Sequence, residues 1–255
     1  MTYSIREAAG LARSAGMTRR FFVAGAAAFT AACSSPSRFS APSAFAPPSR
    51  GDGLAYAGIY GPITTEPFPI PAVDLSLIER QYYRQMVALP YTIPDKPGTI
   101  IVDPGARFLY LAQSDGMALR YGIGVGREGF GWSGGATVGS KQEWPKWFPP
   151  PEMVARDPRA APYANGMPGG IANPLGARAL YLYQGKKDTL FRIHGTNEPW
   201  SIGHAVSSGC IRLLNQDIID LYNRVPIGTS VVVLATAGEP VAAVTEPLSD
   251  ARPRG

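Results

Sequence analysis

The chain has 255 residues, enough for one sizeable domain with extensions at its ends. Only 17% of the residues are charged, whereas 29 Gly and 25 Pro make up about a fifth of the chain, which favours strands joined by turns over a helical bundle. The formal charge of +5 falls to about +2 once residues 1–33 are set aside, too small a surplus to indicate a nucleic-acid-binding protein.

Residues 1–33 have the features of an export signal. Arg19 and Arg20 precede an apolar run over 23–32, which is too short to span a membrane as an ordinary helix. The arginine pair with Phe two places on resembles a twin-arginine signal, although adjacent arginines also begin ordinary export signals. The residues before Cys33 resemble a weak lipoprotein processing site, so acylation of Cys33 and simple cleavage just before it are both open.

The next two segments are expected to lead into the domain. Residues 34–75 are rich in Ser, Pro, Ala and Gly and predict a linker. Residues 76–97 predict a short N-terminal helix and a lead-in, the helix falling between 73 and 87. Asp74 or Ser76 can cap it, and one apolar stripe is formed by Leu77, Ile78, Tyr82 and Met86.

From residue 98 to residue 235 the pattern predicts a mainly β domain. Alternating or continuous apolar runs separated by turn residues predict strands and hairpins. The strand candidates are 99–102, 107–111, 118–123, 179–183, 189–194 and 230–234. One short helix is expected after Asn215, a good N-cap, and it ends at Pro226. Residues 236–255 predict a disordered tail.

Residues 124–176 hold few strand signals but many Gly, Pro and aromatic residues. A loop this long is usually functional or disordered, and its aromatic content argues against disorder. Two interpretations are open for its aromatic side chains: they cover a small core, or they form part of a cleft.

Both histidines and one of the two cysteines lie in residues 194–214. Cys33 lies in the expected signal, so Cys210 has no obvious partner in the rest of the chain. Disulfides are the usual fate of cysteines outside the cytosol, and a lone thiol there indicates a free, reactive group. A Cys–His pair makes a nucleophile near neutral pH, because the imidazole takes the thiol proton.

The local pattern gives this pair a plausible setting. His194 ends a predicted strand where Gly195 breaks the run, and strand ends often carry catalytic groups. Cys210 follows small residues whose backbone can approach a substrate, so the amides of Ser208, Gly209 and Cys210 can converge on an oxyanion. The alternative is that Cys210 is an inert buried side chain and His194 a structural one.

The sequence motifs in residues 194–214 are more specific than the composition of this stretch. The elements are HGT at His194, SIG at Ser201 and SxGC-Ile-Arg-Leu at Ser207, with upstream matches at 136–139 and 173–180. Together they closely resemble the L,D-transpeptidase catalytic (YkuD-type) domain of bacterial cell-wall enzymes, over about residues 98–235. One position departs from the family, since many members have His where this chain has Ser208.

The resemblance implies a β-sandwich or open barrel in which the loop over 124–176 forms much of a cleft. It also implies that Cys210 attacks a peptidoglycan stem peptide, His194 transfers the proton and the Gly195 carbonyl orients the imidazole. No cofactor and no metal are expected. The remaining candidate substrate-binding residues are Arg212, Thr196, Ser207, Tyr121 and Trp132.

Several alternatives remain at this stage. Arg212 could bind a substrate carboxylate, support the thiolate or brace its loop, and His204 is expected to be a loop residue. A metal site at Cys210, His194 and His204 lacks recognisable ligand spacing. The acceptor could be a stem-peptide amine, water or an outer-membrane protein, and a non-catalytic wall-binding module is the other class. The expected location is the periplasm, with membrane attachment only through the signal or a lipid on Cys33.

Overall fold

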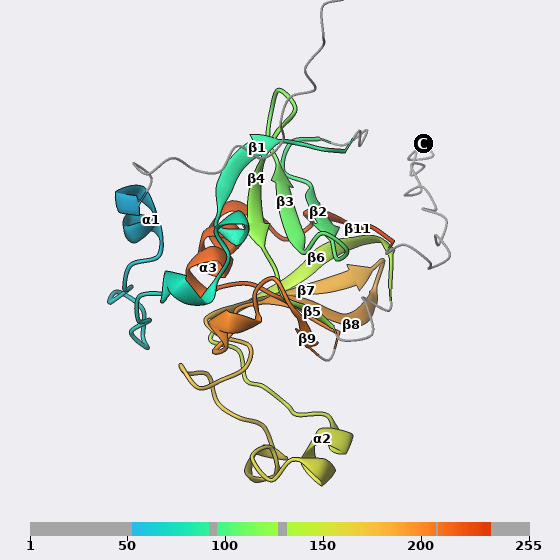
Figure 1. Cartoon of the computed structure of the whole chain (residues 1–255). Coiled ribbons are helices and arrows are strands. Elements are labelled where there is room, and N and C mark those ends of the chain that lie inside the picture. The colour runs from blue at the N-terminus through green and yellow to red at the C-terminus, as the bar shows by residue number, and fades with distance from the viewer. Residues whose placement is uncertain (1–52, 92–95, 127–131, 208, 236–255) are drawn as a thin grey trace, which may run out of the picture. The chain divides into compact units, whose positions relative to one another are not determined.

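The computed structural model describes residues 53–91, 96–126, 132–207 and 209–235 (Figure 1). The expected export signal with Cys33, the first part of the expected linker and the C-terminal tail lie outside these ranges. Within them, no helix combines the length and apolar character needed to cross a membrane.

Short strands dominate the described chain. The helices are α1 (Gly53–Ile59), α2 (Pro151–Arg156) and α3 (Asn215–Arg224), with short 3-10 helices at η2 (Leu75–Leu77), η3 (Arg80–Tyr82), η4 (Ala161–Tyr163) and η5 (Pro199–Ser201). The strands are β1 (Gln85–Ala88), β2 (Ile100–Asp103), β3 (Phe108–Ala112), β4 (Met117–Gly122), β5 (Val125–Gly126), β6 (Gly134–Glu143), β7 (Arg178–Gln184), β8 (Lys187–His194), β9 (Ala205–Ser207), β10 (Ile211–Arg212) and β11 (Ser230–Val233).

Nine of these strands form one mixed sheet in the order β1-β4-β3-β2-β11-β6-β7-β8-β10, and β5 pairs with β9 separately. The pairs are antiparallel except β2 with β11, β8 with β10 and β5 with β9. The hairpins expected from the sequence are present as β3–β4 and β7–β8. Figure 1 shows β1 to β4 at a steep angle to β6 to β8, so the sheet folds back on itself.

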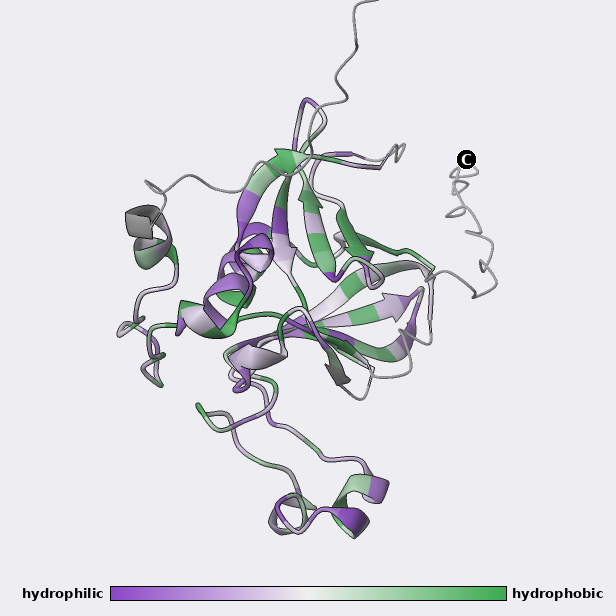
Figure 2. Ribbon diagram, in the orientation of Figure 1, coloured by the Kyte–Doolittle hydropathy of each residue, from purple (hydrophilic) through white to green (hydrophobic). Residues whose placement is uncertain are grey.

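The two halves of the bent sheet enclose the main core. Its buried side chains come from β2, β3 and β4 on one side and from β6, β7 and β8 on the other, with α3 contributing as well. This packing of one sheet half on the other confirms the predicted mainly β sandwich with one short helix after Cys210. Figure 2 shows hydrophobic residues concentrated along β2 and β3.

The outer face of β2 and β3 is also covered. Ile100 and Val102 belong to the main core, whereas Ile101 between them packs in a second cluster. Successive strand residues point to opposite faces, so this alternation means that both faces are buried. The second cluster includes Tyr60 and Tyr82 from residues 53–91, which we call the N-terminal segment. This segment therefore forms a layer of the fold.

Two expectations for this segment are wrong. The linker prediction fails for its described part, because Tyr60 and Ile70 are buried. The expected helix between 73 and 87 is replaced by η2, η3 and β1, and Leu77 and Met86 of its stripe are exposed. Pairing of β1 with β4 satisfies the backbone of this stretch in extended form, so tertiary contact overrides the local helical pattern.

A third expectation also fails, inside the predicted loop over 124–176. Its first part contains β6, a ten-residue strand between β11 and β7. Glycines at 134, 135 and 139 hide the strand pattern, but Gly139 is required where it stands, because an added Cβ would lie 2.4 Å from the Tyr183 ring. The connection between β6 and β7 is therefore residues 144–177. We call it the cleft wall, because many of its residues line a cleft.

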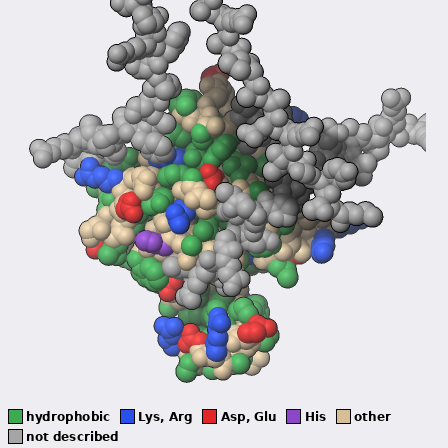
Figure 3. Space-filling view, turned by 45° about the vertical axis from the view of Figure 1, so that its right-hand side comes forward, with side chains coloured by type: hydrophobic (Ala, Val, Ile, Leu, Met, Phe, Trp, Pro, Cys, Tyr) green, Lys and Arg blue, Asp and Glu red, His purple; other side chains and the backbone are tan. Residues whose placement is uncertain are grey.

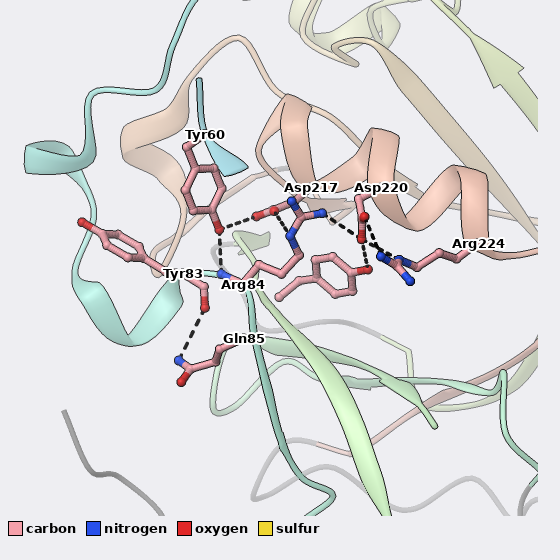
Figure 4. Close-up of polar contacts among 8 residues, drawn as sticks. Tyr60, Tyr83, Arg84, Gln85, Asp217, Asp220 and Arg224 are labelled. Atoms are coloured by element: carbon pink, nitrogen blue, oxygen red, sulfur yellow. Dashed lines mark hydrogen bonds and ion pairs between the residues drawn. The ribbon is translucent and has the colours of Figure 1, made fainter. Parts of the chain in front are cut away.

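The N-terminal segment is fixed to α3 by a buried polar cluster (Figure 4). The Tyr60 hydroxyl donates to Asp217 Oδ2 at 3.2 Å and accepts from the Arg84 backbone N–H at 2.6 Å. Arg84 lies 2.8 Å from Asp220 and 3.5 Å from Asp217. Asp217 is fully buried, and burial raises its pKa to about 7 despite the attraction of Arg84.

This raised pKa predicts a pH-dependent contribution to stability. The pKa of folded Asp217 lies above its unfolded value, so the contribution is fully present below about pH 4 and is lost as the pH rises through about 7. Relative to Asp217→Asn, the wild-type chain should lose up to about 4 kcal/mol of unfolding free energy over that interval. Urea unfolding at a series of pH values measures the difference.

Asp115→Asn, at an exposed turn position, is the matched control and should follow the wild-type profile. Parallel pH profiles for the wild type and Asp217→Asn would contradict the assignment of the raised pKa to Asp217.

Candidate active site

His194 is the last residue of β8, between β7 and β10 in the sheet. Its side chain is buried, and Nδ1 lies 2.6 Å from the carbonyl oxygen of Gly195. A carbonyl oxygen only accepts hydrogen bonds, so Nδ1 carries the hydrogen and Nε2 is the basic nitrogen. The backbone thus fixes both the orientation and the tautomer of the imidazole.

The surroundings keep this imidazole neutral. Burial lowers the pKa of His194 to about 4, and the positive charges of Arg212 and Arg192 act in the same direction. The hydrogen bond with Gly195 acts in the opposite direction and does not offset burial. At neutral pH the free protein therefore presents an uncharged base.

Cys210 is brought close by the parallel pairing of β10 with β8. Ile211 pairs with Ile193 and Arg212 with His194, so Cys210 directly precedes the paired residues. The thiol is not in a disulfide. Burial raises its pKa, while a backbone hydrogen bond with Arg192 and the charges of Arg192 and Arg212 lower it. The resting pair is consequently thiol and neutral imidazole, and a proton transfer must accompany attack.

Cys210 and His194 line one cleft of about 980 Å³, a size suited to a small peptide or drug-sized ligand. Its floor is the sheet, where alternate residues of β8 face the cavity beside Cys210 and Arg212. Its other side is the cleft wall, residues 144–177, and Figure 3 shows basic and acidic side chains together on the lobe around α2. The floor residues are Tyr181, Leu190, Arg192, His194, Cys210 and Arg212, and the wall residues include Trp147, Phe148, Met153, Tyr163 and Met167.

Arg212 lies in this cleft beside His194 and is held by a residue that the sequence did not single out. Its Nη1 donates to Glu198 Oε2 at 2.8 Å, and the Arg212 side chain is 17% exposed against 43% for Glu198. Glu198 precedes η5 and also lines the cleft. The mostly buried guanidinium is therefore paired with a carboxylate that is more exposed than itself.

Three of the predicted substrate-binding residues are not placed to contact a ligand in the cleft. Tyr121 is fully buried in the core and donates to Asp220 at 2.7 Å. Trp132 packs against the core and stacks on Phe191. Thr196 is buried, and its hydroxyl oxygen accepts from the Glu198 backbone N–H at 3.0 Å. None of the three lines the cavity, and only for Tyr121 does strand alternation give the reason, because its position in β4 points into the core.

The predicted oxyanion amides are only partly within the described structure. Ser208 lies outside it, and the structure gives no side-chain placement for Ser207, whose backbone ends β9. Gly209 has φ +124, a conformation that L side chains rarely adopt. The glycine before Cys210 is therefore required by the turn. His204 is exposed in a bend, as expected of a loop residue.

Asn215 has a different role from the predicted N-cap, because α3 begins at Asn215 itself with Leu214 as the cap. Its side chain instead accepts from the Ala177 N–H and donates to the Thr196 carbonyl, both at 3.0 Å. It thereby ties the loop after His194 to the end of the cleft wall. Gly176 makes this approach possible, since an added Cβ would lie 2.2 Å from the Asn215 side chain.

Within the described ranges, no group of three His, Cys, Asp or Glu side chains is placed to hold a metal ion.

Comparisons with known proteins point to one family. A model of the L,D-transpeptidase catalytic domain matches residues 97–233. Probable L,D-transpeptidase YbiS of Escherichia coli K12 is 37% identical over 169 residues, 64% of this chain and 51% of that protein. Putative L,D-transpeptidase YkuD of Bacillus subtilis 168 is 33% identical over 144 residues, 56% of this chain and 68% of that protein. The chain thus spans about half the length of the first of these relatives.

A solved Brucella melitensis structure, named as that of a probable carnitine operon oxidoreductase, is 50% identical. The match covers 63% of this chain and 99% of that one, with a TM-score of 0.42.

The resting state of the Cys–His pair predicts how the thiol reacts. Because the pKa of Cys210 is raised and that of His194 is lowered, alkylation by iodoacetamide should accelerate about tenfold per pH unit between about pH 6 and about pH 8. The rate is measured by mass spectrometry of the modified chain. A rate that is already constant below about pH 7 would indicate a preformed thiolate–imidazolium pair and contradict the prediction.

Proposed function

Because the chain belongs to the L,D-transpeptidase catalytic domain family, we propose that it is a peptidoglycan L,D-transpeptidase. The donor is a tetrapeptide stem whose terminal D-alanine is released. The acceptor is the side-chain amine of a second stem, so the product is a 3→3 cross-link. No metal or cofactor takes part in this reaction.

One observation carries the proposal: a neutral imidazole with its Nε2 free to accept a proton lines the same cleft as an unbridged thiol. Nε2 of His194 takes the proton of Cys210 as the sulfur attacks the carbonyl carbon before D-alanine. The carbonyl oxygen gains negative charge, and the amides of Ser208, Gly209 and Cys210 are the proposed donors to it. The C–N bond breaks, His194 returns the proton to the leaving amine, and a thioester remains.

The second half of the reaction reuses the same base. The acceptor amine attacks the thioester carbon and loses a proton to Nε2 of His194. The C–S bond breaks, and the proton passes to the Cys210 sulfur, which restores the thiol and neutral imidazole. The Gly195 carbonyl keeps Nδ1 protonated throughout, so Nε2 faces the reacting atoms in both halves.

Arg212 is the proposed site for a substrate carboxylate. Its guanidinium lies in the cleft, and its contact with the exposed Glu198 can be exchanged for a ligand carboxylate of the same geometry. With its charge so close to Cys210, Arg212 also stabilises the thiolate as it forms.

We also propose export to the periplasm, directed by residues 1–33 through a twin-arginine-like signal. Lipid attachment at Cys33 and simple cleavage before it remain the two processing routes. An outer-membrane protein amine is the alternative acceptor, and acylation of Cys210 by a carbapenem is expected of the proposed nucleophile.

The decisive measurement is the product set of the full chain incubated with disaccharide-tetrapeptide, read by mass spectrometry. The wild type should form dimers that have lost one D-alanine. Cys210→Ala should form none, and His194→Ala should be slower by about 10²- to 10⁴-fold, the usual cost of removing a general base. His204→Ala, at the exposed histidine of the same stretch, is the matched control and should retain activity.

The other product patterns have distinct meanings. Tripeptide without dimers would mean that water resolves the thioester, as in a carboxypeptidase, or that the required acceptor is a protein. Absence of turnover together with absence of a carbapenem adduct on Cys210 would overturn the enzymatic proposal and leave a wall-binding module.

A further inference from the structure

A closed loop of the N-terminal segment, residues 60–73, reaches the base of the cleft wall. We call it the N-terminal hairpin, because Ile63 and Ile70 exchange both backbone hydrogen bonds at 2.9 Å. Its ends are fixed where Val73 donates to the Tyr60 carbonyl, also at 2.9 Å. Gln216 of α3 donates to the carbonyls of Gly61 and Pro71 and holds the hairpin to the domain.

Glu66 lies near the tip of this hairpin and contacts two residues outside it. Its carboxylate accepts two hydrogen bonds from Arg178, at 2.7 and 2.9 Å, and one from the Trp144 indole N–H at 2.9 Å. The Arg178 and Glu66 side chains are 6% and 12% exposed. Burial alone would raise the pKa of Glu66, but the hydrogen bonds from Arg178 and Trp144 lower it. The carboxylate is therefore held in its charged form.

The two partners of Glu66 lie at the two ends of the cleft wall. Trp144 directly follows the last residue of β6, and Arg178 is the first residue of β7. The Trp144 backbone N–H donates to the Ala177 carbonyl at 2.8 Å, so the two ends of the cleft wall are adjacent. Phe68 of the hairpin packs edge to face on Trp144 with ring centroids 4.9 Å apart. A single carboxylate thus joins both ends of the wall.

Arg178 also connects the contacts of Glu66 to His194, the proposed base. Its carbonyl oxygen accepts from the Gly195 N–H at 3.0 Å, and the Gly195 carbonyl fixes Nδ1 of His194. The placement of the wall and the position of the Gly195 peptide therefore depend on the same arginine.

We propose that Glu66 is a positioning residue of the active site: by joining Trp144 to Arg178 it sets the cleft wall against the floor that carries Cys210 and His194. Glu66 touches neither substrate nor nucleophile. Its kinetic effect rests on the proposed function, since it acts on binding of the donor peptide along the wall. A reagent too small to contact the cleft wall should react with Cys210 at the same rate whether or not Glu66 is present.

The test uses the full chain and two measurements, amide hydrogen exchange and steady-state kinetics with disaccharide-tetrapeptide. In Glu66→Gln, exchange at Trp144 and Gly195 should accelerate by about tenfold or more, as expected for loss of a charge-assisted bidentate contact. KM for the tetrapeptide should rise about tenfold, and kcat should fall by less than KM rises, because the Gly195 carbonyl keeps its own contact with Nδ1 of His194. Iodoacetamide alkylation of Cys210 should change less than about twofold.

Three further variants separate positioning from general stability. Glu66→Asp keeps the charge and should restore part of the wild-type KM. Trp144→Phe keeps the ring against Phe68 but removes the indole donor, and should give an intermediate KM. The control is Glu79→Gln, because Glu79 is exposed and its carboxylate accepts a hydrogen bond from the neighbouring Gln81 side chain at 2.7 Å. This variant should behave as the wild type.

Unchanged exchange at Trp144 and Gly195, or unchanged KM, in folded Glu66→Gln would overturn the inference. Exchange that rises equally in β2 to β4 would overturn it too, since that indicates general loss of stability. If the wild type does not turn over tetrapeptide, the proposed function fails while the exchange result still decides the role of Glu66.

Discussion

The parallel pairing of β10 with β8 is the constraint on which the site depends. It sets Arg212 beside His194 and leaves Cys210 directly before the pair, so residues sixteen positions apart in the chain line one cavity. In the proposed reaction the strand end supplies the base and the turn at Gly209 supplies the nucleophile, and the Gly195 carbonyl fixes the tautomer of the imidazole. Contacts outside the strand pair support this arrangement: Gly124 exchanges two backbone hydrogen bonds with Arg212, and the Leu213 backbone N–H donates to the His194 carbonyl at 2.8 Å.

The electrostatics of the site follow from burial. A fully buried imidazole stays neutral and a buried thiol stays protonated, while Arg192 and Arg212 favour the thiolate. In the proposed reaction, proton transfer from Cys210 to His194 therefore accompanies attack. The partly exposed Glu198 pairs with Arg212 at 2.8 Å, so the positive charge of Arg212 is balanced within the floor of the cleft.

The N-terminal segment is part of this machinery. It covers the outer face of β2 and β3, anchors to α3 through Tyr60, Arg84 and Asp217 (Figure 4), and reaches the cleft wall through Glu66. The family match begins only at residue 97. The segment before it therefore packs against the matched region and contributes contacts that this region does not itself contain.

The sequence by itself determined the features that depend on local patterns and motifs. These are the hairpins around Ser114 and Gly185, the helix after Cys210, and the Cys–His pair with its family resemblance. The tertiary structure alone decided which side chains face the cleft. Tyr121 looked available but points into the core, Asn215 crosses to Ala177 instead of capping its helix, and Gly-rich β6 is a central strand. Glu66 carried no signal, because its partners lie 78 and 112 positions away. Local patterns report backbone preference, whereas face, register and long-range pairing are fixed only when the strands pack.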